Sequence, residues 1–210
     1  MVGIENKRFT CHLVKHEEVY ELSYLLAGKI MQAGYAADVV VAIARGGFPP
    51  ARYICDFIDL SELASIRLKH YQSAAREQEK IDLKNPVNTE VRNRNVLIVD
   101  DVNDTGGTLE TAVGYLNGLQ PKNLKVGVLH EKKDSVFQAD FVADYVKEWR
   151  WITYPWAMVE DIGSFLKKRG KPVDSLEEAR GFLKSEYAID ITNEQLDKIF
   201  ALRPHLFRSA

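Results

Sequence analysis

Apolar residues follow two different patterns in the first two thirds of the chain. Between residues 17 and 34 they recur at every third or fourth position, which predicts an amphipathic helix that ends near Gly34. Residues 39–44, 96–99 and 126–129 instead form short, almost uninterrupted apolar runs. Such runs are typical of strands that are buried on both faces of a parallel sheet. The apolar positions of the helix are Val19, Leu22, Leu25, Leu26, Ile30 and Met31.

Helical patterns separate these apolar runs from one another. One is predicted from Ala51 to Phe57, after two prolines, and another begins after Thr108. Strand, polar turn, helix and strand in succession predict the βαβ units of an open parallel sheet. The apolar positions of the second helix are Leu109, Ala112, Val113 and Leu116.

The other segments are polar or helical. Residues 70–94 are almost wholly polar. So long a loop in a compact domain is usually functional or mobile, although a solvated hairpin or helix would have the same composition. From residue 160 onward the chain is predicted to be helical. Asp174 or Ser175 is positioned to cap one helix, and Thr192 with Gln195 has the spacing of a capping box.

Composition narrows the class of protein. Of 210 residues, 46% are hydrophobic and 28% are charged, which excludes collagen, coiled coil and wholesale disorder. The formal net charge of -2 argues against a dedicated nucleic-acid binder. Cys11 and Cys55 are expected to be reduced thiols, because two cysteines make neither a disulfide framework nor a complete zinc site. No apolar run is long enough to span a bilayer and no signal sequence is recognisable, so we expect a cytoplasmic protein.

Residues that could bind a ligand or take part in a reaction follow the end of each apolar run. The three runs are followed by Arg45-Gly46-Gly47, by residues 100–108 and by Glu131-Lys132-Lys133. Ligands of open α/β sheets bind beyond the carboxyl ends of the strands. The sequence therefore predicts a ligand site at this edge of the sheet.

Residues 100–108 have the character of a site for a sugar phosphate. Gly106 and Gly107 allow the backbone to approach a ligand closely, and successive N–H groups at a helix start bind anions. No lysine stands in this turn, so it is not a Walker A loop, and no GxGxxG motif is present. The carboxylates of Asp100 and Asp101 would accept hydrogen bonds from sugar hydroxyls. The alternative is an acidic strand end followed by a helix cap.

The stretch from Val96 to Thr108 resembles the phosphoribosyl-diphosphate signature of type I phosphoribosyltransferases, in which an apolar strand leads into an acidic pair and a Thr-Gly-Gly-Thr turn. The resemblance covers roughly residues 8–158 and is strongest to the compact bacterial and archaeal 6-oxopurine enzymes. It implies an α/β fold with a central, largely parallel five-stranded sheet flanked by helices, and a small hood over the base. We expect residues 1–158 to form this domain and residues 159–210 to form a helical appendage.

The resemblance assigns roles to the sugar and diphosphate ligands. Asp100 and Asp101 would hold the ribose hydroxyls, and the turn after them would cradle the 5′-phosphate. Arg45 and Gly46 resemble the family's diphosphate loop, in which a non-proline peptide is often cis. Lys69 resembles the lysine at the start of a mobile catalytic loop that closes over the site. The set expected around ribose 5-phosphate is Asp100, Asp101, Val102, Asn103, Asp104, Thr105, Gly106, Gly107 and Thr108.

The resemblance implies that four residues contact the purine base. Asp104 matches the aspartate near purine N7 that is the proposed general base, a role that a pKa raised by nearby anions would favour. Lys132 matches the lysine that donates to the 6-oxo group, with Lys133 as the alternative if the alignment is shifted by one. Trp151 would stack on the purine, and the backbone of Ile152 would meet its edge. A helix cap, a solvated lysine and an aromatic packing residue are the structural alternatives for Asp104, Lys132 and Trp151.

The activity implied is transfer of the 5-phosphoribosyl group from its 1-diphosphate to N9 of guanine, hypoxanthine or xanthine, a step of purine salvage. Mg²⁺ is the implied cofactor, held only indirectly by Asp100 and Asp101. The implied partners are these small substrates and a second or further copy of the chain, as a dimer or tetramer, with no nucleic acid and no membrane. Many relatives carry an acidic residue where this chain has Ala157, which leaves a second metal open, with Glu160 or Asp161 as substitutes.

Two other functions remain open at this point. One is a ligand-sensing regulator that keeps the fold and binds purine-linked signals; it should show a basic face or an added DNA-reading helix. The other is a phosphoribosyltransferase for adenine or a pyrimidine, for which Asp104 and Lys132 would have other roles.

Overall fold

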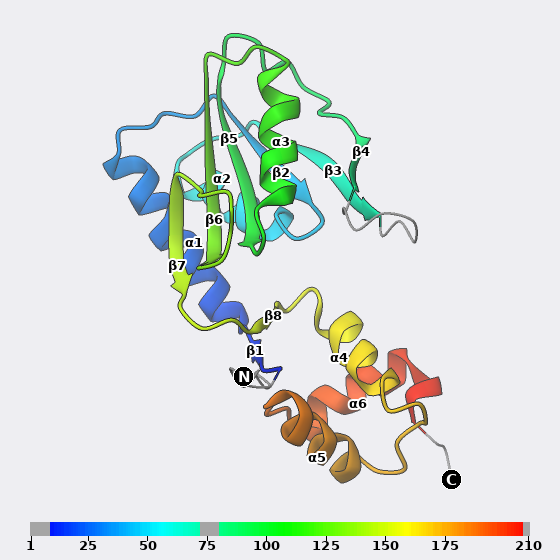
Figure 1. The fold of residues 1–210 in the computed structure, drawn as a ribbon. Coiled ribbons are helices and arrows are strands. Elements are labelled where there is room, and N and C mark those ends of the chain that lie inside the picture. Colours follow the sequence, from blue (N-terminus) through cyan, green and yellow to red (C-terminus); the bar gives the residue numbers. More distant parts are fainter. Residues whose placement is uncertain (1–8, 72–79, 208–210) are drawn as a thin grey trace, which may run out of the picture. The chain divides into compact units, whose positions relative to one another are not determined.

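The computed structural model describes residues 9–71 and 80–207, which form two compact units (Figure 1). The sheet unit runs from Glu17 to Trp149. The helical unit combines the residues up to His16 with those from Arg150 onward. The boundary that we predict at residue 158 falls inside the helical unit, and each unit is described by itself.

A six-stranded sheet forms the centre of the sheet unit, in the order β4-β3-β2-β5-β6-β7 (Figure 1). Five strands are parallel, and β4 joins the edge in antiparallel orientation. The α/β fold with a largely parallel sheet is thus confirmed, and the sheet has one strand more than predicted. The strands are β2 (Val39–Ala44), β3 (Leu63–Tyr71), β4 (Lys80–Asn85), β5 (Asn95–Asn103), β6 (Asn123–Lys132) and β7 (Phe141–Val146).

Helices cover both faces of this sheet. Helix α3 (Gly107–Asn117) packs on one face, where Leu109, Ala112 and Leu116 join the apolar side chains of alternate strand positions. Helices α1 (His16–Gln32) and α2 (Phe48–Phe57) lie on the other face and contact each other through aromatic rings (Figure 1). Cover on both sides explains why the central strands read as continuous apolar runs.

The helix boundaries follow the sequence closely. Helix α1 ends before Gly34, whose φ of 67° lies in the left-handed region that glycine favours. Leu25 and Met31 are nevertheless exposed, by 50% and 61%. The face of α1 that is buried is narrower than the stripe of apolar residues along it. Helix α2 begins three residues earlier than predicted, since two prolines fit its first turn, where no N–H partner is needed.

The polar segment after residue 70 forms the two arms of a hairpin. Strand β3 continues to Tyr71, and β4 pairs with it in antiparallel orientation from Lys80. The hairpin alternative therefore holds for the described arms, while residues 72–79 of the predicted loop lie outside the described residues.

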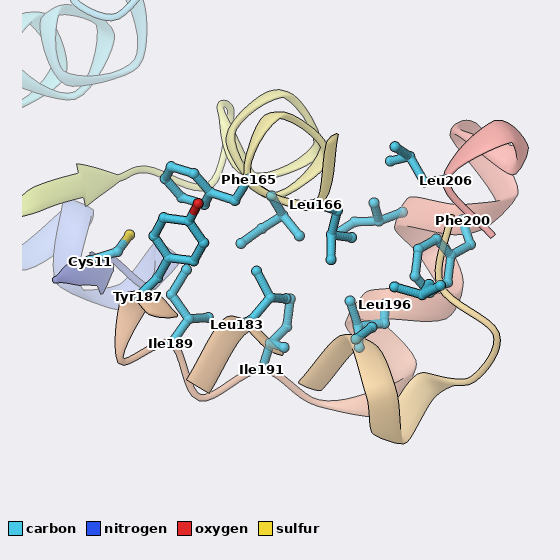
Figure 2. Close-up of a cluster of buried hydrophobic side chains, with 14 residues drawn as sticks. Cys11, Phe165, Leu166, Leu183, Tyr187, Ile189, Ile191, Leu196, Phe200 and Leu206 are labelled. Atoms are coloured by element: carbon cyan, nitrogen blue, oxygen red, sulfur yellow. The ribbon is translucent and has the colours of Figure 1, made fainter. Parts of the chain in front are cut away.

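The helical unit joins a two-stranded parallel sheet to a cluster of helices. Strand β1 (Cys11–Leu13) pairs with β8 (Trp151–Thr153). Fourteen buried residues close the apolar core between the helices (Figure 2). The predicted helix starts are confirmed: Ser175 accepts a hydrogen bond from Glu178 N, and Thr192 with Gln195 forms the capping box. The helices are α4 (Met158–Lys167), α5 (Leu176–Tyr187), α6 (Asn193–Leu202) and a short 3₁₀ helix (Pro204–Leu206).

Both cysteines are free thiols in buried positions, as predicted. Burial is the main cause that raises the pKa of Cys55 to about 11, so this thiol is not activated. Among the described residues, no helix is both long and apolar enough to cross a membrane.

Candidate active site

The carboxyl ends of four parallel strands meet at one edge of the sheet. Strand register places Ala44 of β2 opposite Arg67 of β3, and Asn103 of β5 opposite Glu131 of β6. The three turns that the sequence singled out therefore leave the sheet at the same edge, as predicted.

The turn after β2 is shaped by its glycines. The peptide between Ala44 and Arg45 is cis, as the resemblance implies. A Cβ on Gly47 would lie 2.4 Å from the carbonyl oxygen of Val99, so any larger residue would push the backbones of β2 and β5 apart. The position therefore admits only glycine.

Gly46 brings this turn against the acidic pair. A Cβ on Gly46 would lie 2.2 Å from Oδ2 of Asp101, so the missing side chain is what leaves room for that carboxylate. The predicted diphosphate turn and the predicted ribose-binding residue are thus direct neighbours.

Asp100 is buried at the same edge, with 7% of its surface exposed. Burial raises the pKa of Asp100 well above its ordinary value, and the neighbouring charge of Asp101 raises it further. The backbone N–H of Asp101 donates to Asp100 Oδ1 over 2.9 Å, which opposes the shift without cancelling it. A carboxyl group held in this way is costly for the fold, and such groups gather at functional sites.

Strand β5 continues through the acidic pair to Asn103 and does not end at Val99 as predicted. The reason is its pairing with β6, which extends to Asn103 opposite Glu131. Asn103 is 1% exposed, and its amide donates to Glu131 Oε2 (2.8 Å) and to the carbonyl of Phe137 (2.7 Å). Its side chain therefore ties β5 to β6 and to the segment around Phe137.

The glycines at the start of α3 form the turn that follows. Gly106 has a φ of 97°, and a Cβ there would lie 2.6 Å from the backbone nitrogen of Phe137. Both the conformation and the close approach require glycine. Helix α3 begins at Gly107, so the N–H groups of Thr105 to Thr108 lie at a helix N-terminus, which carries a partial positive charge. This geometry suits a phosphate.

Asp104 and Lys132 form an ion pair at the end of the turn. Lys132 Nζ lies 2.9 Å from Asp104 Oδ2, with the lysine side chain 4% exposed and the aspartate 39% exposed. A lysine so deeply buried is rare unless it is paired, which counts against the solvated-lysine alternative. Asp104 makes no side-chain cap to α3, whose N-cap is Gly106.

Trp149, which the sequence reasoning missed, lies beside this pair. The centre of its ring is 4.6 Å from Lys132 Nζ. Its place follows from the pairing of β6 with β7. That pairing puts Lys132 opposite Val146 and so brings the residues after β7 close to the lysine.

Lys69 lies on β3, two residues beyond the partner of Ala44, and its side chain is exposed. Its position on this edge agrees with the predicted role near the diphosphate. Strand β3 ends two residues after Lys69, and the residues that follow Tyr71 lie outside the described range.

Trp151 and Ile152 belong to the helical unit. Trp151 N donates to the carbonyl of Thr10 (2.8 Å), and Val14 N donates to that of Thr153 (2.9 Å). Because successive strand residues direct their backbone groups to opposite edges, those of Ile152 point away from β1. This orientation suits the predicted contact with a base edge.

The indole of Trp151 is held from two directions. Its Nε1 donates to Asp161 Oδ2 over 2.9 Å, and its ring stacks on that of Phe9 with centres 6.3 Å apart. Thr153 Oγ1 donates to the same oxygen over 2.7 Å. Burial is the main cause that raises the pKa of Asp161, and both hydrogen bonds oppose the rise.

Comparison with known proteins agrees with this arrangement. The family model described as the phosphoribosyl transferase domain matches residues 13–161. The chain belongs to this family. A xanthine-guanine phosphoribosyltransferase of Ruegeria sp. is 33% identical over 124 residues, which cover 57% of this chain and 68% of that protein.

Two solved structures are also similar to this phosphoribosyl transferase domain. A purine phosphoribosyltransferase from Pyrococcus horikoshii has a TM-score of 0.62 and 28% identity, and covers 70% of this chain and 94% of its own. A hypothetical protein from Neisseria gonorrhoeae with bound ppGpp has a TM-score of 0.64 and 29% identity, and covers 78% of this chain and 98% of its own.

The acidic position that many family members carry is Ala157 here, at the start of α4. Of the two substitutes considered, Asp161 has one carboxylate oxygen engaged by Trp151 and Thr153. Glu160 is exposed in the first turn of α4. Asp161 thus holds the indole of Trp151 in place.

Proposed function

We propose that this chain transfers the 5-phosphoribosyl group from 5-phosphoribosyl 1-diphosphate to N9 of a 6-oxopurine, as in purine salvage. The observation that carries the proposal is the ion pair of Asp104 with the buried Lys132, next to a turn whose geometry suits a phosphate. Its relatives named xanthine-guanine and hypoxanthine-guanine phosphoribosyltransferases support the same reaction.

The pair matches one edge of a 6-oxopurine. The 6-oxo oxygen accepts hydrogen bonds and the neighbouring N7 can carry a proton, so an ammonium and a carboxylate side by side complement them. An adenine would present its amino group, which is a donor, to the ammonium. The 2.9 Å separation of Lys132 Nζ from Asp104 Oδ2 brings donor and acceptor close enough to meet neighbouring atoms of one base.

The sugar phosphate would occupy the acidic turn. The N–H groups of Thr105 to Thr108 would bind the 5′-phosphate, and the carboxylates of Asp100 and Asp101 would accept hydrogen bonds from the ribose hydroxyls. Arg45, Gly46 and Lys69 would meet the diphosphate. The backbone N–H groups at the start of α3 are fixed before the reaction, and fixed dipoles stabilise developing charge without reorganisation.

Phosphoribosyltransferases generally depend on Mg²⁺, and the residues present fit an indirectly held ion. In the described part of the chain, no group of three or more histidine, cysteine, aspartate and glutamate side chains is placed to hold a metal. An ion here would therefore take its oxygens mainly from the substrate and water, with Asp100 and Asp101 behind the ribose hydroxyls, as suits Mg²⁺. Its chemical contribution would be to neutralise the leaving diphosphate.

Asp104 would act as the general base. As N9 attacks C1 of the ribose, the purine loses a proton from its imidazole ring, and the Asp104 carboxylate accepts it. Lys132 keeps its proton and donates to the 6-oxo group, where electron density rises. Trp151 would stack on the base and the backbone of Ile152 would meet its edge.

A base-competition assay tests the proposal. The purified chain, with 5-phosphoribosyl 1-diphosphate and Mg²⁺, is expected to convert hypoxanthine, guanine or xanthine to the nucleoside monophosphate and to leave adenine and orotate unused. Preference for adenine or orotate would contradict the roles of Asp104 and Lys132. Sedimentation in the same buffer checks the expected dimer or tetramer.

A ligand-sensing regulator is the second candidate, because the similar Neisseria protein holds ppGpp. Such a protein would bind a guanine nucleotide at this edge without turnover. Tight binding of ppGpp together with no product from any 6-oxopurine would favour it. The near-neutral charge of the chain argues against the DNA contact that such a regulator would need.

A further inference from the structure

Trp149 completes a three-residue cluster around the buried ammonium of Lys132. Asp104 Oδ2 lies 2.9 Å from Nζ, and the centre of the Trp149 ring lies 4.6 Å from the same nitrogen. The lysine side chain is 4% exposed, so these groups replace most of its water. All three residues belong to the sheet unit.

A buried ammonium needs a counter-charge, and the proposed reaction takes part of it away. When a purine enters, the Asp104 carboxylate has to turn toward the imidazole proton of the base, which weakens its ion pair with Lys132. The indole face still attracts the ammonium at that point, because the electron-rich face of tryptophan attracts a cation. Without such a holder, a lysine on its flexible four-carbon stem has other orientations open to it.

We propose that Trp149 is a positioning residue for Lys132, and that it sets the preference of the site for bases with a 6-oxo group. The inference rests on the proposed function, since it takes Lys132 as the donor to that group. Trp149 acts through the lysine and not by stacking on the base, the role predicted for Trp151.

The pairing of β7 with β6 explains why Trp149 lies beside Lys132. Strand β7 pairs with β6 so that Val146 lies opposite Lys132, the last residue of β6. Trp149 follows three residues later, in the connection that leads to β8. It is 39% exposed, so its replacement removes little core packing.

The test compares bases with and without the 6-oxo group. Binding of hypoxanthine and of unsubstituted purine is measured by titration calorimetry with Mg²⁺ and ribose 5-phosphate, which fills the sugar site without reacting. In Trp149→Leu, the preference for hypoxanthine over purine is expected to fall about threefold to tenfold, the range of a partly desolvated cation–π contact. Trp149→Phe, which keeps an aromatic face, should restore most of it.

A double-mutant cycle separates positioning from a general structural effect. In the Lys132→Met background, Trp149→Leu should have no further effect on the preference, because no ammonium is left to hold. An equal loss in both backgrounds would overturn the inference. Tyr24→Leu is the matched control, an exposed aromatic residue on α1 of the same unit, and should leave the preference unchanged.

The outcomes for the function and for Trp149 are distinct. No turnover of any 6-oxopurine by the unmodified chain would contradict the proposed function, while the binding preference would still decide the role of Trp149. An unchanged preference in Trp149→Leu, with turnover intact, would overturn the inference alone.

Discussion

At the carboxyl edge of the sheet unit, ionisable side chains are buried and glycines stand where no side chain fits, whereas the helical unit is closed by apolar contacts and capped helices. Asp100 and Lys132 are 7% and 4% exposed at the edge. In the helical unit, Leu183 and Leu196 are wholly buried in the core, and Thr192 satisfies the start of α6.

The two regions differ in what their residues cost the fold. A buried carboxyl group with a like-charged neighbour destabilises the native state, whereas a buried leucine and a helix cap stabilise it. Residues that destabilise the fold persist where the ligand needs them. Substitutions at the edge should therefore change activity more than stability, and substitutions in the helical core should do the reverse.

The largest effect on activity is expected from Asp104→Asn. Asparagine keeps an acceptor beside Lys132 but cannot take the purine proton, so kcat should fall about 10²- to 10⁴-fold. The melting temperature should also fall, because the buried Lys132 ammonium loses its counter-charge, but the loss of activity should be the larger effect. Steady-state kinetics and calorimetry check both halves. A variant with full activity would remove the contrast between the two regions.

The largest effect on stability is expected from Leu183→Ala. This side chain is 0% exposed in the core of the helical unit, so truncation should cost about 2–5 kcal/mol of unfolding free energy (Figure 2). The kcat measured well below the transition should stay near that of the unmodified chain. Calorimetry would also show whether only one of two transitions shifts. Loss of kcat in the folded variant would mean that this core takes part in the reaction.

Much of the fold could be predicted because it depends on local signals. The run Val39–Ala44 predicted a buried strand, and Thr192 with Gln195 predicted a helix start, because both depend on residues close in sequence. For strand β4 the sequence left a loop, a hairpin and a helix open, because a polar edge strand owes its place to its partner β3.

The site was predictable only as far as its motifs reached. The acidic pair and the glycines lie in one stretch, so their shared role was visible in the sequence. The contact of Lys132 with Trp149 depends on the register of β6 with β7, which no local pattern encodes. The hydrogen bond of Asn103 to Glu131 likewise depends on the pairing of β5 with β6, which the motif alone does not show.

Asp100→Asn sharpens the comparison because it should raise stability while it lowers activity. Since the folded pKa of Asp100 is raised, the native state binds more protons than the unfolded state above the ordinary carboxyl pKa. Stability of the unmodified chain is therefore lost as the pH rises through this interval, and asparagine removes that loss. Melting curves should show a gain near neutral pH, about 2–4 °C for each kcal/mol relieved, which disappears below the ordinary pKa. A gain that is the same at every pH would show that the titration of Asp100 is not its cause.

The smallest effect is expected from Thr192→Ala, which removes a helix cap in the helical unit. Thr192 Oγ1 accepts from Gln195 N over 3.2 Å, and Thr192 N donates to Gln195 Oε1 over 3.0 Å. Loss of the first bond should cost about 1 kcal/mol of unfolding free energy with no change in kcat or in the preference among bases. Thr192→Ser keeps the hydroxyl and should behave like the unmodified chain in the same denaturant titration. If the alanine variant instead altered base preference, the start of α6 would be coupled to the chemistry, and the division between a reactive edge and a purely stabilising helical core would fail.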